Sequence, residues 1–231
     1  MQCEIPKVLT EVKGKALIEH LLKNIEPVCA RPTVVVGYRG DDVVARLGAE
    51  KYYYVWQKEQ LGTGHAVKCA RESLRGKNFS NIVVLYGDHP MVGAETVQRL
   101  VEAREKNGAT IAMGTISLPG YEDHHRVFSH FSRVLRDEKR EIAGSVEFKD
   151  ATDEEKKITE VNPSYYCFEA AWLWDNLDAL KNENAAKEYY LTDLQKMAFE
   201  QQRKIVGVDI APLEGMGANT PEELGIISKF L

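Results

Sequence analysis

The sequence predicts an α/β protein in which a mixed, mostly parallel sheet of Rossmann-like type is flanked by helices. Three observations lead to this prediction. Short runs of β-branched residues alternate with longer stretches of helical periodicity. Several of these runs are apolar on both faces, which is typical of buried parallel strands. The 231 residues are 44% hydrophobic, enough for a sizeable core, and no linker rich in Gly, Ser or Pro divides them. We therefore predict one domain, 1–231.

In the first half of the chain, strands and helices alternate one by one. Apolar residues recur along one face in four segments that we predict as helices, 14–25, 41–47, 64–74 and 96–106. Between them lie four predicted strands, 33–37, 51–56, 81–86 and 109–116. Such an alternation favours βαβ units and a parallel sheet, so residues 1–118 are predicted to be a nucleotide-binding half.

Beyond residue 118 the predicted strands follow one another more closely, at 133–136, 142–148, 158–168 and 204–210, with helices at 171–180 and 188–202. This more mixed half, 119–231, is predicted to hold a second substrate. The polar stretch 120–131 is predicted as a loop. It carries His124, His125 and His130, but no carboxylate or cysteine at ligand spacing accompanies them, so a solvated loop is favoured over a metal site.

Composition excludes several classes of protein. With 30 basic and 35 acidic side chains the formal net charge is −5, whereas binding to nucleic acid or an anionic membrane requires basic clusters. No apolar run approaches the roughly 20 residues that span a bilayer. The first residues lack the apolar core of a signal peptide. The four cysteines, Cys3, Cys29, Cys69 and Cys167, form no C-x-x-C motif, which argues against disulfides and structural zinc. A cytoplasmic location is expected.

The first candidate site residue is Asp88, which follows the predicted strand 81–86. Ligands of α/β sheets bind at the carboxyl ends of the strands, where one carboxylate can hold a divalent cation on a nucleotide's phosphates. The alternative is an aspartate that caps the following turn. His89 is set aside as a second metal ligand, because neighbouring residues on an extended chain point apart.

A loop between a strand and a helix is the second candidate. Gly62 and Gly64 let the backbone approach another group closely, and amide donors at a helix start bind anions or base edges. Gln57 and Gln60 add amide groups able to read a base. The alternative is a tight turn with no ligand. His65, the first helical residue, is expected to pack or cap.

Two further segments carry polar groups of interest. Lys7 precedes a hydrophobic segment and could reach a phosphate as a point charge, or lie on the surface. Asn219, in a glycine-bearing turn after the last predicted strand, could supply a second oxygen ligand to a metal. Thr192 is expected to cap the helix it precedes, and Tyr189 and Tyr190 are expected in the core.

Together these segments resemble a known family. The motifs are residues 6–9 (Pro-Lys-Val-Leu), 14–15 (Gly-Lys), 60–66 (Gln-Leu-Gly-Thr-Gly-His-Ala), 86–90 (Tyr-Gly-Asp-His-Pro), 146–152 (Val-Glu-Phe-Lys-Asp-Ala-Thr) and 188–193 (Glu-Tyr-Tyr-Leu-Thr-Asp). Residues 6–15 look like the opening of bacterial sugar-1-phosphate nucleotidyltransferases. Residues 60–66 resemble the uridine-binding loop of N-acetylglucosamine-1-phosphate uridylyltransferases, the pyrophosphorylase part of the bifunctional enzymes that make UDP-N-acetylglucosamine. The resemblance covers essentially the whole chain.

This resemblance implies a GT-A-like nucleotidyltransferase fold and a Mg²⁺-dependent reaction of UTP with N-acetylglucosamine 1-phosphate. A phosphate oxygen of the sugar would attack the α-phosphorus in line, expelling pyrophosphate, with no protein nucleophile. The roles it implies are catalysis for Lys7 and Asp88, uracil binding for Gln57, Gly62 and Thr63, sugar binding for Tyr86, Gly87, Glu147 and Asn162, and Mg²⁺ ligation for Asp88 and Asn219.

The chain departs from the family pattern in several places. The family begins with a strand and a glycine-rich phosphate loop, of which only the final Met1 is expected here. Ser132 replaces a glycine that lets the backbone approach the sugar, and Pro163-Ser164 replaces the commoner Thr-Gly. The glycine turn before Asn219 is one residue longer. No hexapeptide repeats follow, so neither a left-handed β-helix domain nor acetyltransferase activity is expected.

These departures leave two alternatives to the main hypothesis. One is a nucleotidyltransferase that uses another sugar 1-phosphate or another nucleotide. The other is a non-catalytic nucleotide-sugar-binding protein that lacks the phosphate loop. A dinucleotide oxidoreductase is not indicated, because no G-x-G-x-x-G follows a predicted strand. The oligomeric state is left open.

Overall fold

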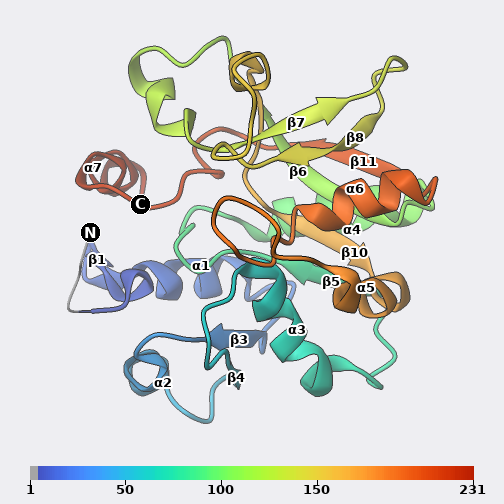
Figure 1. Ribbon diagram of the computed structural model, residues 1–231. Coiled ribbons are helices and arrows are strands. Elements are labelled where there is room, and N and C mark those ends of the chain that lie inside the picture. Colours follow the sequence, from blue (N-terminus) through green and yellow to red (C-terminus); the bar gives the residue numbers. More distant parts are fainter. Residues whose placement is uncertain (1–4) are drawn as a thin grey trace.

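The computed structural model describes residues 5–231, and Figure 1 shows their arrangement. The helices are α1 (Leu17–Ile25), α2 (Gly40–Leu47), α3 (Thr63–Leu74), α4 (Ala94–Lys106), α5 (Ala170–Asn176), α6 (Asp193–Glu200) and α7 (Pro221–Phe230). The strands are β1 (Glu11–Val12), β2 (Lys15–Ala16), β3 (Thr33–Val36), β4 (Tyr53–Trp56), β5 (Asn81–Val84), β6 (Ile111–Ser117), β7 (Ser132–Arg136), β8 (Ile142–Val146), β9 (Glu160–Asn162), β10 (Tyr166–Glu169) and β11 (Ile205–Asp209). Short 3₁₀ helices lie at Lys7–Leu9, Asp123–Phe128, Glu155–Lys157 and Leu177–Ala179.

The main sheet has seven strands in the order β5-β10-β6-β9-β7-β8, with β11 beside β6. A separate two-stranded sheet is formed by β3 and β4. The predicted mixed α/β fold is confirmed, but its pairing is less parallel than expected. Among residues 5–231 only β6–β11 and β3–β4 pair in parallel. The reason is that β10, from the second half of the chain, runs antiparallel between β5 and β6.

The core lies on both faces of this sheet, as the alternation of side chains along a strand requires. On β6, Ala112 and Ile116 point into a cluster that also contains the apolar faces of α1 and α4. Ile111 and Met113 point into a second cluster with α5 and α6. The predicted halves 1–118 and 119–231 therefore share one sheet and both clusters. That one half binds the nucleotide and the other the second substrate stays a prediction.

The structure corrects two element boundaries. The predicted strand 158–168 is two strands, β9 and β10, because Pro163 has no amide hydrogen to donate and Ser164 adopts a left-handed backbone with φ of 65°. The predicted helix 188–202 begins only at Asp193, and Glu188 and Tyr190 before it line the cleft described below. The predicted loop 120–131 contains a 3₁₀ helix whose Val127 and Phe128 are buried.

Helix α7 was not predicted, although its start carries a clear signal. Thr220 is the N-cap and its hydroxyl accepts from the Glu223 amide at 3.2 Å, with Pro221 in the first turn. The Glu223 carboxylate accepts in return from the backbone amides of Thr220 and Asn219. This is a capping box, and it fixes the chain at Asn219.

Candidate active site

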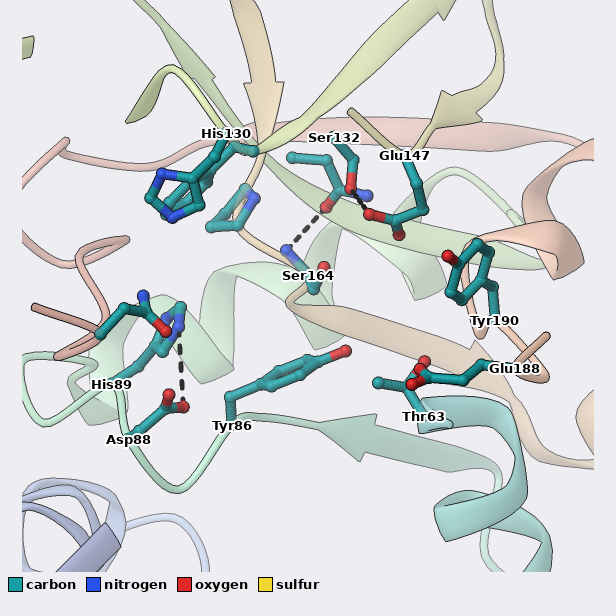
Figure 2. Close-up of a pocket in the computed structure, with 14 residues that line it drawn as sticks. Thr63, Tyr86, Asp88, His89, His130, Ser132, Glu147, Ser164, Glu188 and Tyr190 are labelled. Carbon is teal, nitrogen blue, oxygen red and sulfur yellow. Dashed lines mark hydrogen bonds and ion pairs between the residues drawn. The ribbon is translucent and has the colours of Figure 1, made fainter. Parts of the chain in front are cut away.

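A cleft of about 360 Å³ lies where the ends of several elements converge (Figure 2). Its polar wall comes from residues that follow β5 and β8, from the end of β9, from the start of β7 and from the segments before α6 and α7. The lining side chains are Thr63, Tyr86, Asp88, His89, His130, Phe131, Ser132, Glu147, Asn162, Pro163, Ser164, Glu188, Tyr190 and Asn219. The cleft thus brings together residues that are far apart in the sequence.

At one end of the cleft three predicted site residues meet. The Lys7 ammonium donates to the carboxylate of Asp88 and to the amide oxygen of Asn219. The loop before α7 is held there because the Ala218 amide donates to the Asp88 carbonyl at 3.1 Å. Burial opposes ionisation of Asp88, but the adjacent His89 and Lys7 outweigh it, so the pKa of Asp88 lies below its usual value. An ionised carboxylate and an amide oxygen therefore converge on one cation.

His89 also lies at this end, contrary to the prediction that it points away from Asp88. A turn closed by the His89 amide on the Tyr86 carbonyl brings the imidazole back toward its neighbour. Its Nε2 lies 3.8 Å from Asp88 Oδ1, and its Nδ1 lies 2.6 Å from the Tyr165 hydroxyl. Burial lowers the pKa of His89.

At the other end of the cleft lies Glu147. Its two oxygens accept from the hydroxyls of Ser132, at 2.7 Å, and Thr192, at 2.9 Å. Figure 2 shows Ser132 and Glu147 facing each other across the wall. Thr192 precedes α6 as expected, but its side chain makes no cap to the helix, because the hydroxyl is used by Glu147. The predicted role of Thr192 as a capping side chain is wrong.

Asn162 is buried between the two ends and is held by a polar network. Its amide nitrogen donates to the Tyr166 hydroxyl at 2.6 Å and to the Ser145 hydroxyl at 3.2 Å. Its amide oxygen accepts from the Ser164 amide at 2.7 Å, which accounts for the left-handed backbone at Ser164. A buried amide with fixed partners presents one fixed orientation to the cleft.

Tyr86 crosses the floor of the cleft, with its ring below Ser164 and its hydroxyl toward Thr63 (Figure 2). Burial raises the pKa of Tyr86, and the charge on Glu147 raises it further. Burial also raises the pKa of Tyr190 to about 12. Both hydroxyls therefore remain protonated donors at neutral pH. Tyr190 was expected in the core and instead lines the cleft.

The predicted base-binding loop leads into the cleft, but only Thr63 lines it. Gln57 Nε2 donates to the Gly62 carbonyl at 2.9 Å and lies 3.2 Å from His65 Nδ1. Gly62 has φ of 105°, and an added Cβ would lie 2.8 Å from the Tyr189 carbonyl. Gly87 likewise lies behind the wall, where an added Cβ would meet Val8 at 3.2 Å. At both glycines, therefore, the backbone lies close to other residues of the chain.

The family model for the MobA-like NTP transferase domain matches residues 1–189. The chain belongs to this NTP transferase family. The predicted class of enzyme, a nucleotidyltransferase, is thereby confirmed.

Curated relatives are similar over the whole chain. The Bifunctional protein GlmU of Clostridium tetani is 35% identical over 238 residues, covering 100% of this chain and 49% of its own length. GlmU of Anaeromyxobacter sp. (strain Fw109-5) is 39% identical over 236 residues, covering 100% of this chain and 46% of its own length. The chain thus spans about half the length of these relatives. The resemblance to bacterial N-acetylglucosamine-1-phosphate uridylyltransferases is confirmed.

Solved structures share the fold at low identity. A CMP:2-keto-3-deoxy-manno-octonic acid synthetase complexed with CTP superposes with a TM-score of 0.67 at 17% identity, covering 97% of this chain and 90% of its own. HddC from Yersinia pseudotuberculosis complexed with GMP-PN gives 0.67 at 13% identity, covering 100% and 92%. In the described part of this chain, none of the helices combines the length and apolar character needed to cross a bilayer.

Several lining residues of this NTP transferase were not selected from the sequence. His130, Pro163 and Ser164 reach the cleft because turns before β7 and after β9 fold over it. The departures at Ser132 and Ser164 were a usable signal, since each places a side chain where the family tends to have glycine. Of the three histidines predicted to lie in one solvated loop, His130 lines the cleft, with its Nε2 3.9 Å from Glu223, whereas His124 and His125 do not line it.

The Gly62→Ala substitution is expected to lower the free energy of unfolding by about 3 kcal/mol, because the new methyl group would overlap the backbone at Tyr189. Its φ of 105° adds strain that only glycine avoids. Urea unfolding followed by circular dichroism measures this. The control is Gly225→Ala in α7, where no atom lies within 4 Å and the helix should gain up to about 1 kcal/mol. Equal midpoints for the two variants would refute the assignment.

Proposed function

We propose that the protein transfers a uridylyl group from UTP to N-acetylglucosamine 1-phosphate, giving UDP-N-acetylglucosamine and pyrophosphate. One observation carries this proposal. The cleft has a cation-binding end at Lys7, Asp88 and Asn219 and a hydroxyl-binding end at Glu147 and Asn162. A reaction that joins a nucleoside triphosphate to a sugar phosphate needs both ends in one space. The family match and the similarity to GlmU proteins support the same reaction class.

At the cation end, Asp88 and Asn219 would hold Mg²⁺. An ionised carboxylate and an amide oxygen are the hard oxygen ligands that this ion prefers, and both already face one positive charge, the Lys7 ammonium. Mg²⁺ bound there supplies charge neutralisation on the phosphates. Lys7 would then contact a phosphate oxygen as a flexible point charge, moving from the place it now holds between the two ligands.

At the sugar end, Glu147 would accept hydroxyl hydrogens from the sugar through the lone pairs that Ser132 and Thr192 leave free. Asn162 and the Tyr86 hydroxyl would add neutral hydrogen bonds, and Gly87 would support Tyr86 from behind. Gln57, Gly62 and Thr63 would hold the uracil, with Gln57 setting the shape of the loop. We propose that residues 1–118 bind the nucleotide and residues 119–231 bind the sugar.

The reaction requires the protein to align two anions, and the protein forms no covalent bond with either of them. A phosphate oxygen of the sugar attacks the α-phosphorus, the bond to the β-phosphate bridging oxygen breaks, and pyrophosphate leaves with that electron pair. The described cleft supplies positive charge at one end and fixed hydrogen bonds at the other. Such preorganisation stabilises charge that develops in the transition state. We also propose a cytoplasmic location.

The test is pyrophosphate release from a panel of nucleoside triphosphates and sugar 1-phosphates, with and without EDTA. We expect turnover with UTP and N-acetylglucosamine 1-phosphate that EDTA abolishes and Mg²⁺ restores. Turnover with another sugar only would favour the alternative in which Ser132 narrows the sugar end through its contact with Glu147. Binding of UDP-sugar without turnover on any pair would refute the enzyme and favour a binding protein.

A further inference from the structure

The carboxylate of Glu147, at the sugar end of the cleft, is held by two neutral hydroxyl groups. Its Oε2 accepts from the Ser132 hydroxyl at 2.7 Å, and its Oε1 accepts from the Thr192 hydroxyl at 2.9 Å. Within residues 5–231, no lysine, arginine or histidine forms an ion pair with Glu147. Both hydroxyl side chains are enclosed, since Ser132 and Thr192 are each only 4% exposed. The carboxylate is therefore oriented from both of its oxygens.

The pairing of the strands places Ser132 beside Glu147. Strand β7 lies between β8 and β9, and Ser132 pairs with Asn162 on β9. On the other side Arg133 pairs with Val146 in an antiparallel ladder, so Ser132 and Glu147 stand opposite each other one step further along. Side chains at opposite positions of neighbouring strands point to the same face of the sheet. The backbone thus fixes the contact between Ser132 and Glu147.

Thr192 holds the second oxygen instead of capping its own helix. It stands at the N-cap position of α6, where a threonine hydroxyl usually accepts from an amide of the first turn. Here the side chain makes no cap, and the hydroxyl donates to Glu147. Two hydroxyls that are 60 residues apart in the sequence therefore orient one carboxylate.

These two hydrogen bonds leave Glu147 with free acceptor positions. An ionised carboxylate accepts about four hydrogen bonds, two on each oxygen. Ser132 and Thr192 use one position on each oxygen, so one remains on each. Glu147 lines the cleft, and Figure 2 shows its carboxylate beside the Ser132 hydroxyl. Two free acceptors on one carboxylate lie side by side, as they do when a carboxylate receives two parallel bonds from an arginine.

We propose that Ser132 and Thr192 are positioning residues that make Glu147 a bidentate acceptor, so that the sugar end selects sugars with hydrogen-bond donors on two adjacent carbons. This inference rests on the proposed function, since it concerns the sugar that this function places here. In the N-acetylglucosaminyl group every adjacent pair of donors contains the 3-hydroxyl, together with either the 2-amide N–H or the 4-hydroxyl. The 6-hydroxyl belongs to no such pair. Selection therefore depends on the 3-hydroxyl.

The test measures binding of UDP-N-acetylglucosamine and of its 3-deoxy and 6-deoxy forms by isothermal titration calorimetry, without turnover. The wild-type protein should bind the 3-deoxy form about tenfold more weakly than the parent, the scale of one hydrogen bond to a charged group, and the 6-deoxy form within about twofold. In Ser132→Ala the carboxylate loses one of its two restraints. The ratio of the 3-deoxy to the parent dissociation constant should then fall to about threefold or less, because the two groups are coupled.

Matched variants separate orientation of the carboxylate from general loosening of the site. Thr192→Val removes the hydroxyl but keeps the shape, and should lower the ratio in the same way. Thr192→Ser retains the hydroxyl and should keep the wild-type ratio. Ser73→Ala should leave the ratio unchanged, since the Ser73 hydroxyl donates to the Ala70 carbonyl in α3, outside the cleft. A purely structural role for Ser132 would weaken binding of all three ligands alike and leave the ratio as it is.

Three results would overturn the proposal: a ratio near one in the wild-type protein, a full ratio in a folded Ser132→Ala protein, or no binding of any of the three ligands. If the expected ratios are found but no pair of substrates turns over, the proposed reaction fails and the role of Ser132 stands. If pyrophosphate is released but Ser132→Ala does not change the ratio, the reaction stands and the role of Ser132 fails.

Discussion

Replacing Asp88 with asparagine is expected to lower kcat for pyrophosphate release by about 10³-fold, the scale of losing one group that stabilises transition-state charge. The asparagine keeps the size of the side chain but removes the negative charge that faces Lys7 and, in the working enzyme, would face Mg²⁺. Added Mg²⁺ should not restore the rate, because the ligand itself is changed. Initial-rate kinetics over a Mg²⁺ series measures the effect.

The matched control is Asp178→Asn. Asp178 is also an ionised carboxylate between cations, since its bonds with Arg71 and Lys68 hold its pKa at about 2. It lies outside the cleft, so its loss should change kcat by less than about twofold. Asp178 itself is exposed and asparagine keeps an acceptor for Arg71, so the substitution should cost little stability. An Asp88→Asn protein that is folded and keeps more than about a tenth of the wild-type rate would contradict the role of Asp88.

The Arg133→Met variant is expected to lower the free energy of unfolding by about 3–4 kcal/mol, a loss at the upper end for one side chain. Arg133 is only 1% exposed. Its guanidinium donates to the carbonyls of Phe131, Ser129 and Lys156, the last two at 2.7 and 3.3 Å. Methionine keeps the length and apolar character of the stem but leaves these carbonyls without their donor.

The Arg133→Met substitution should also weaken binding of the sugar phosphate in the cleft. Residues 129–131 carry His130 and Phe131 into the wall, and Arg133 ties their backbone to β7. Urea unfolding gives the stability change, and a sugar phosphate titration gives the binding change. The control is Arg136→Met, whose guanidinium pairs with Glu160 at the partly exposed edge of the same strand and should contribute less than about 1 kcal/mol. Similar midpoints for both variants would show that the buried guanidinium is not needed.

Sequence patterns determined the elements and the cation end of the site. Strand β5 (Asn81–Val84) is rich in β-branched residues, and the Tyr-Gly-Asp motif that follows it places Asp88 beyond the carboxyl end of this strand, at the cleft. Motif order then indicated Lys7, Glu147, Asn162 and Asn219, which the structure brings to one cleft or, for Lys7, to the carboxylate that lines it. The helix α7 could have been found from Thr220, Pro221 and Glu223 alone, because a capping box is a local signal.

Tertiary structure decided which partners each of these residues has. The insertion of β10 between β5 and β6 depends on pairing between residues about 85 apart, for example Val84 with Tyr166, and no local periodicity encodes it. Local periodicity also does not encode the partner of Thr192, whose hydroxyl donates to Glu147 instead of capping its own helix. Nor does it encode the partner of Gly62, where the absence of a side chain leaves room for the backbone of Tyr189.

His89 shows the difference most clearly. Its position next to Asp88 in the sequence suggested that the two side chains diverge, and that would be true of a strand. A single turn, closed by its own amide, together with the contact to Tyr165, directs Nε2 toward Asp88 instead. Local propensity acts over a few residues and therefore fixes elements and their ends, whereas the direction of a side chain at a site is set by hydrogen bonds to residues distant in the chain.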